Sequence, residues 1–454
     1  MLPRLRFVVF LTAMFVIALP VHAATLLEIY QQAAQSDPQI LAAAAAHRAA
    51  LEAGPQSRAA LLPQISATGN ASRNRDEIAN ASAGFLRNGV YDFNSHGYAL
   101  NLTQAVYHHE LGMRLRQANT RIAQADAVYG AAEQELIVRT ASAYFNALAA
   151  HDDQTFAHAE RDALAGQLEQ SKQRFNVGVI AITDVQEAQA RYDLAAAQAI
   201  SADNQRASQD EALRELTGSA PETLHGLGAT LPLVMPKPDD MEQWVKTALT
   251  QNLQLSAAEN ALKVAQEEIG RRRAAHLPSL DLIGSHGFQS YGGGPFGGRH
   301  ETLTTVMLQL NVPLFSGGLV NSRTREAVAL QEQSREQVEQ LRRATERQTR
   351  DAFRGISASI STVTALKQAA TSNQTALEAA TAGNEVGTRT LVDVFNAQSN
   401  LYRAKRDYAR ARYDYLLNTL RLKQAAGTLS PNDLTQLNGF LTAAAAGSGE
   451  SSPH

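Results

Sequence analysis

RFNVGVIAITDVQEAQA at residues 174–190 and VGTRTLVDVFNAQ at residues 386–398 are two versions of one phrase, about 209 positions apart. In each version four residues separate a Val-Gly pair, at Val177 or Val386, from a Thr-Asp-Val or Val-Asp-Val triplet. The match continues into a shared Ala-Gln pair. Ordered similarity at one fixed shift is typical of an internal repeat, so the phrase predicts a chain built twice from one unit.

Two further blocks recur in the same order. Residues 61–65 align with 276–280, and residues 213–218 align with 422–427, where the closing glycine suits a left-handed helix cap. Between the copies, residues 219–240 carry four prolines, which interrupt any helical pattern. We interpret this segment as a linker between two repeats.

Each repeat is predicted to form a helix, two strands and two long helices. In the first repeat, 24–218, the strands are expected at about 63–75 and 97–107 and the long helices at about 110–175 and 182–217. In the second, 241–427, the strands are expected at about 278–290 and 301–315 and the long helices at about 319–383 and 390–426. A C-terminal segment, 428–454, ends in a small and polar stretch from Thr442 that we expect to be disordered.

The long helices carry a heptad seam. From Leu115 to Ala150, apolar or small residues recur mostly at alternating steps of three and four. The following helix repeats the pattern, so the two helices can pack as a coiled coil. In the second repeat, a helix of about 64 residues would be roughly 96 Å long at 1.5 Å per residue. Taken alone, these helices fit a structural coiled-coil rod.

The predicted strands alternate in polarity with a period of two. Val306, Leu308 and Leu310 alternate mainly with polar residues, as in a transmembrane β-strand with lipid on one side and water on the other. The hairpin connections, at about 76–95 and 290–300, are rich in Gly and Asn and suit the extracellular side. Four strands cannot close a barrel, since about eight is the smallest number known, so several chains must contribute strands.

The first residues predict a secretory signal peptide, 1–23. Arg4 and Arg6 precede an apolar run at 7–19, and small residues occupy the cleavage positions before Ala24. The run is about 13 residues long, short of the roughly 20 that a membrane-spanning helix needs. The chain has no Cys, which excludes disulfides, thiolate metal sites and an acylated N-terminal cysteine. Because no later stretch offers about 18 consecutive apolar residues, we expect no membrane-spanning helix.

Composition and motifs argue against several function classes. The formal net charge is -3 and basic residues are scattered among acidic ones, so we expect no nucleic-acid binding. Residues 292–297 satisfy the GxGxxG spacing but lie in a predicted hairpin loop, which is the wrong setting for a dinucleotide site. We interpret His108, His109 and Glu110 as a barrel-to-helix corner, because adjacent strand residues point to opposite faces and cannot share a metal. We predict no enzyme activity and no cofactor.

Together with the signal peptide and the duplicated unit, the phrases at 174–190 and 386–398 resemble the TolC family of outer-membrane export channels, over nearly all of the mature chain. The phrase LRLKQAAGTL at 420–429 fits the same family. The resemblance implies a homotrimer whose twelve strands form a β-barrel in the outer membrane and whose helices form a tunnel across the periplasm. It also implies a periplasmic adaptor (membrane fusion) protein and an inner-membrane ABC, RND or MFS transporter as partners. The function would be type I protein secretion, multidrug efflux or both.

The same resemblance implies roles for individual residues. Asp184 and Arg389 match links that hold the periplasmic entrance closed, and Asp393 matches a lumen-facing ring of acids. The chain departs from the family at Asn384, where its best-known members have Tyr, and at Asn396, where they have a second Asp ring. Without the resemblance, these charges would read as ordinary solvated helix positions. The alternative function is a periplasmic coiled-coil scaffold without a membrane barrel.

Overall fold

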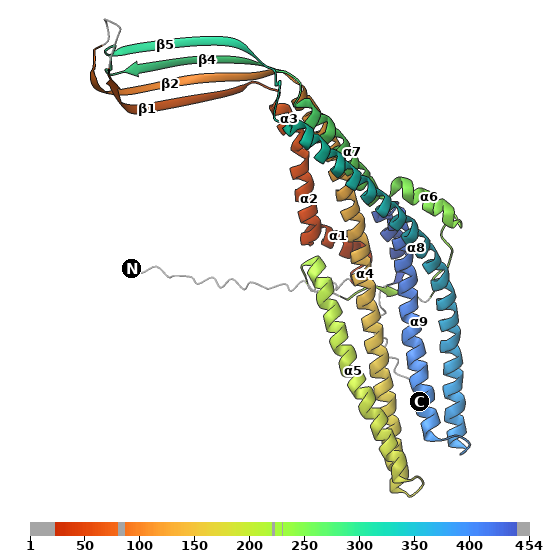
Figure 1. Cartoon of the computed structure of the whole chain (residues 1–454). Coiled ribbons are helices and arrows are strands. Elements are labelled where there is room, and N and C mark those ends of the chain that lie inside the picture. Colours follow the sequence, from red (N-terminus) through yellow and green to blue (C-terminus); the bar gives the residue numbers. More distant parts are fainter. Residues whose placement is uncertain (1–22, 80–86, 220–222, 229, 443–454) are drawn as a thin grey trace, which may run out of the picture.

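The computed structural model describes residues 23–79, 87–219, 223–228 and 230–442 (Figure 1). The predicted signal peptide lies outside the described residues except for Ala23, and so does the predicted disordered tail except for Thr442. The fold is mixed α and β and mostly helical, with a four-stranded sheet at one end and long helices running away from it. Within the described ranges, no helix is both long enough and apolar enough to cross a membrane.

Upstream of each hairpin the chain breaks the single predicted helix into shorter ones. They are α1 (Leu26–Ser36), α2 (Pro38–Leu51) and α3 (Ala53–Ala59) in the first repeat, and α6 (Met241–Gln251) and α7 (Leu253–Ala274) in the second. Pro38 has no N–H to continue α1, and the Asp37 carboxylate accepts hydrogen bonds from the first N–H groups of α2. Asn252 caps α7 in the same way.

The four long helices lie within about two residues of their predicted bounds. They are α4 (His109–Asn176) and α5 (Ile182–Thr217) in the first repeat, and α8 (Leu319–Glu385) and α9 (Leu391–Ala425) in the second. Gly218, directly after α5, has the left-handed backbone expected of a cap, with φ of 72°. The 68 residues of α4 span roughly 100 Å.

The linker and the C-terminal segment contain elements that the sequence analysis did not predict. β3 (Gly226–Leu227) in the linker pairs with β6 (Leu441–Thr442), and α10 (Pro431–Asn438) precedes β6. Ala24 joins the same region through a bridge to Leu224. Strands of two residues carry no periodic signal, so only long-range pairing creates them.

The sheet is antiparallel throughout, in the order β1-β2-β4-β5. Its strands are β1 (Gln64–Ile78), β2 (Gly89–His108), β4 (Ser279–Tyr291) and β5 (Arg299–Asn311). The predicted connection at 76–95 is wrong, because the ladder continues until Ile78 lies opposite Gly89. Tyr91 and Phe93 alternate with polar residues there, and cross-strand pairing outweighs the loop character of the polar ones. The strand predicted at 301–315 ends at Asn311, since Pro313 has no N–H to donate to a ladder.

One face of the sheet is apolar and exposed. Val306, Leu308 and Leu310 of β5 are 74%, 66% and 64% exposed. Directly opposed residues share a face, so the register groups the side chains into rows across the sheet. Neighbouring rows are Ile65, Leu102, Gly284 and Val306 on the apolar face, and Ser66, Asn101, Ser285 and Thr305 on the polar face. The alternation predicted from the sequence is therefore present in these rows, which cross all four strands.

The long helices pack as two antiparallel pairs, α4 with α5 and α8 with α9, and α9 also packs on α4. The largest core includes Tyr144 and Phe145 of α4 and Leu416 of α9, all fully buried. Phe145 stacks on Tyr413 with ring centroids 5.8 Å apart. The contact of α4 with α9 joins the two repeats and so holds one hairpin against the other.

Candidate functional site at the tips of the helical hairpins

Two short turns close the helical hairpins at the end away from the sheet (Figure 1). Their backbones match: Gly178 and Gly387 have φ values of 79° and 78°, a conformation that favours glycine. In each turn a backbone N–H donates a hydrogen bond to the carbonyl oxygen five residues earlier, and these equivalent bonds, of 2.9 and 2.8 Å, close the turns. In each following helix the third residue is an aspartate, Asp184 in α5 and Asp393 in α9.

The tip of the second hairpin is docked on the first. Phe395 of α9 is 1% exposed and packs in a cluster with Leu164 and Leu168 of α4 and with Val185 and Ala188 of α5. Burying one phenylalanine side chain contributes roughly 1.5 to 3 kcal/mol. This docking holds the first turns of α9 beside the α4–α5 turn.

A cavity of about 240 Å³ lies between the two tips. Asp184 and Asn384 both line it, so the structure brings these two predicted positions together. Arg389 has an exposed side chain outside the cavity lining, and its backbone carbonyl accepts a hydrogen bond from Asn384 Nδ2 at 3.1 Å. Within the described residues of one chain, no ion pair joins Asp184 to Arg389.

The aspartates of the two tips differ in the hydrogen bonds that their carboxylates accept. Asp393 forms a capping box with Thr390: its carboxylate accepts the Thr390 N–H at 2.9 Å, and its own N–H donates to Thr390 Oγ1 at 3.2 Å. The hydrogen bonds from the Thr390 backbone and hydroxyl hold the pKa of Asp393 below its usual value. The equivalent cap of α5 is Ala181, which has no side-chain oxygen, so the half-buried Asp184 has no capping partner.

The remaining predicted position, Asn396, is exposed on α9 three residues after Asp393. Sequence reasoning did not single out Thr390 or Phe395. The Thr-x-x-Asp spacing was a signal for Thr390, since an acid three residues after a hydroxyl marks a helix start. Phe395 carried no signal beyond its apolar character.

The other motifs have structural settings. His108 ends β2, and its Nε2 lies 2.9 Å from an Asp281 carboxylate oxygen, while His109 begins α4. Residues 292–297 lie in the connection between β4 and β5. In the portion of the chain that the structure describes, no group of three or more His, Cys, Asp or Glu could hold a metal ion.

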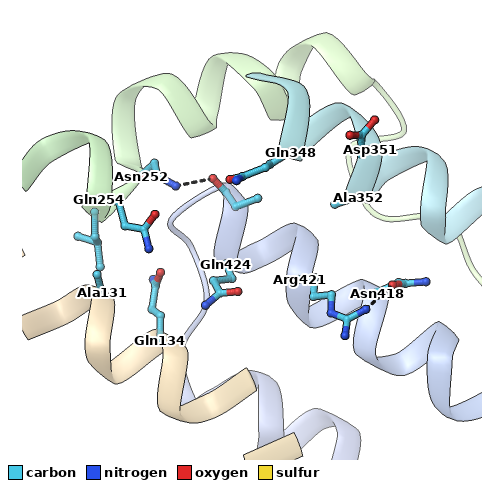
Figure 2. A pocket seen from close by; sticks show the side chains of 12 residues that line it. Ala131, Gln134, Asn252, Gln254, Gln348, Asp351, Ala352, Asn418, Arg421 and Gln424 are labelled. Carbon is cyan, nitrogen blue, oxygen red and sulfur yellow. Dashed lines mark hydrogen bonds between the residues drawn. The ribbon is translucent and has the colours of Figure 1, made fainter. Parts of the chain in front are cut away.

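A larger cavity, of about 500 Å³, lies where α4, α7, α8 and α9 meet (Figure 2). Its lining is rich in amide side chains, among them Gln134, Gln254, Gln348 and Gln424. Gln134 Nε2 donates to the carbonyl of Gly427, and Asn252 Nδ2 donates to the carbonyl of Ala425, both at 3.0 Å. These bonds tie the end of α9 to α4 and α7, so the cavity marks a structural junction between the repeats.

Paired helical hairpins that continue from an amphipathic four-stranded sheet define a class of outer-membrane channel. The chain belongs to the outer membrane efflux protein family, whose model matches residues 29–219 and 244–428. This is a family of transport channels rather than enzymes, and it places the protein in the outer membrane, extending into the periplasm. The family resemblance drawn from the sequence is confirmed.

Individual proteins are similar to this chain over most of its length. The chain is 38% identical to outer membrane protein TolC of Vibrio cholerae, over 93% of this chain and 95% of that protein. It is 33% identical to the alkaline protease secretion protein AprF of Pseudomonas aeruginosa, over 90% of this chain and 85% of that protein. The CmeC outer membrane channel of Campylobacter jejuni has the same fold, with a TM-score of 0.77 at 17% identity over 91% of this chain and 89% of that one.

Proposed function

We propose that three copies of this chain form one outer-membrane exit duct. The observation that carries the proposal is the sheet, in which, among the described strands, β1 pairs only with β2 and β5 only with β4. An open edge is not tolerated in lipid, because each unsatisfied backbone group costs several kcal/mol. Four strands from each of three copies give a closed barrel of a size found among outer-membrane proteins.

The helical hairpins of the three copies form a tunnel through the periplasm. Leu194 and Ile200 of α5 are exposed in the single chain, and this supports packing of α5 against a neighbouring copy. A periplasmic scaffold without a barrel is the weaker alternative. It gives no role to the apolar face of the sheet, and it conflicts with the family's place in the outer membrane.

The duct works with a periplasmic adaptor protein and an inner-membrane ABC, RND or MFS transporter. The tips of the hairpins lie furthest from the sheet, so they are the part of the duct that such partners would reach first. The similarity to AprF, whose name records alkaline protease secretion, supports type I protein secretion. The family's description as efflux proteins supports drug efflux.

The tips form the closed entrance. Asp184 and Arg389 are not paired with each other inside the described chain, which leaves them available to pair between neighbouring copies. Threefold symmetry brings three copies of Asp393 together as a ring of acids, and the neutral Asn396 reduces the negative charge where the family resemblance implies a second ring.

The experiment is fractionation followed by native mass spectrometry in detergent and conductance in planar bilayers. We expect the protein in the outer-membrane fraction, a mass of three chains, and discrete channels. A monodisperse monomer with native strand content would overturn the trimer. A protein that is soluble without detergent would favour the scaffold.

A further inference from the structure

A polar seam joins α9 to α4 above the docked tip. The two helices run antiparallel, and their polar side chains meet in order along the contact. The pairs are Ser399 with Glu160, Arg406 with Glu160 and Asp153, and Tyr413 with Asp152. Every pair takes one member from each repeat, so the seam crosses between the two hairpins.

Glu160 is the centre of this seam. It is 4% exposed, and both of its carboxylate oxygens are occupied by groups from α9. Oε1 accepts a hydrogen bond from Ser399 Oγ at 2.8 Å, and Oε2 accepts one from Arg406 Nη1 at 3.2 Å. A buried carboxylate that loses such partners is costly, so the arrangement that supplies both is favoured over any in which α9 leaves α4.

Arg406 adds a second contact to the same helix. Its Nε lies 3.4 Å from Asp153 Oδ1, so one guanidinium spans two acids of α4 that lie about two helical turns apart. The side chain is half-buried, which limits screening by salt. Ion pairs on the exposed tips are weak by comparison, because water and salt screen them.

The seam and the tip belong to one unbroken helix. α9 begins at Leu391, and Ser399 follows Asn396 by three residues on it. We propose that Glu160 and Arg406 are positioning residues for the closed entrance: they hold α9, and with it Asp393 and Asn396, against α4. If the entrance opens by separation of the second hairpin from the first, this contact has to break. The inference rests on the proposed function as an entrance-gated duct.

The test is single-channel conductance of Arg406→Ser in planar bilayers, with the trimer verified by native mass spectrometry. We expect the ratio of open to closed time to rise by about fivefold or more, the low end of a typical coupling between two sites. Arg410→Ser is the matched control. Arg410 is exposed and pairs with Asp414 on its own helix, so its loss should leave the ratio as in the wild type.

Exchanging the charges of Glu160 and Arg406 distinguishes a positioning role of this pair from a general loss of packing. Glu160→Arg combined with Arg406→Glu should close the channel again relative to either single change, and Arg406→Lys should rescue in part. If Arg406→Ser and Glu160→Gln both form stable trimers that conduct like the wild type, the positioning role is wrong. If Arg406→Ser fails to assemble, Ser399→Ala tests the proposal instead, because it removes only a neutral hydrogen-bond donor to Glu160. It should raise the open ratio, and an unchanged ratio overturns the proposal.

The outcome is distinguishable from failure of the proposed function. Suppose that Arg389→Ser makes the channel open more readily and Arg406→Ser does not. That result would overturn the positioning role and leave the duct intact. A wild-type trimer that never conducts would overturn the duct itself, and the seam's role in gating with it.

Discussion

Asp184 and Asp393 occupy the same position in their helices, but only Asp393 has a carboxylate that is hydrogen-bonded to the residue that caps its helix. Thr390 provides that bond, whereas Ala181 stands at the equivalent place in the first repeat. One acid is therefore committed to its own helix start. The other remains available to a group from a second chain.

Asp393→Ala should relieve block of the channel by multivalent cations added from the periplasmic side. In the proposed trimer, three carboxylates in a narrow entrance would concentrate negative potential, and the substitution would remove all three. Block should be weaker than in a relative with two acidic rings, because Asn396 is neutral. Thr390→Val is the matched control, since it removes the side-chain bonds but keeps the ring. Equal block before and after Asp393→Ala would contradict the ring.

The same block should survive mild acid. Hydrogen bonds from Thr390 lower the pKa of Asp393 below its usual value of 3.8. A lowered pKa means that the charged form and its helix cap are stable above that value and are lost only as the pH falls through the lower, folded-state pKa. Block measured against pH should thus persist to lower pH in the wild type than in Thr390→Val, in which the midpoint should move upward. Identical midpoints for both proteins would show that the Thr390 hydroxyl does not lower this pKa.

Arg389→Ser or Asp184→Ala should raise single-channel conductance, and the double variant should add little to either. Each exposed ion pair contributes only about 0.2 to 1 kcal/mol, but three symmetric copies give roughly 0.6 to 3 kcal/mol. Asn384 lines the cavity beside Asp184 where the family resemblance implies a tyrosine, so the wild-type entrance is expected to be looser and the effect smaller. If both single variants form stable trimers that conduct like the wild type, a link between Asp184 and Arg389 does not hold the entrance closed.

Leu308→Arg or Leu310→Arg should impair assembly in the outer membrane. Both side chains are exposed on the apolar face, and an arginine facing lipid costs about 2 to 4 kcal/mol near the midplane. Gln309→Arg is the control, because Gln309 lies between them and shares the opposite face with Asp281. The yield of trimer extracted from the outer membrane is the measurement. A similar loss for all three variants would refute the assignment of the faces.

Gly427→Ala should destabilise the protein far more than Gly387→Ala. Both glycines have positive φ, 74° and 78°, so alanine is strained at each by about 1 to 2 kcal/mol. At Gly427 the added Cβ would also clash with the carbonyl oxygen of Gln251, which adds about 1 to 3 kcal/mol, whereas Gly387 faces open space. Thermal unfolding in detergent measures the difference, and equal midpoints would contradict the clash.

Local sequence patterns were sufficient to predict the long helices but not the contacts between them. The heptad seam and the glycine at Gly218 predicted α4 and α5, because these signals reside within one element. The outer part of β2 was missed, since Asn94 and its neighbours favour loops until β1 pairs with them. Glu160 gave no signal at all. A carboxylate in a long polar helix looks solvated until the path of α9 is known, and that path depends on packing across the whole chain.

The two open edges of the sheet, β1 and β5, are unlike each other, so in the proposed trimer a closed ring would join β1 of one copy to β5 of the next. Each copy then makes two different contacts, and a single damaged edge opens the whole ring. In a cell that produces intact and damaged chains in equal amounts, roughly one ring in eight would contain only intact copies. Alleles that damage an edge strand should accordingly be dominant. Alleles that unfold the helical core remove their own chain before assembly, and these should be recessive.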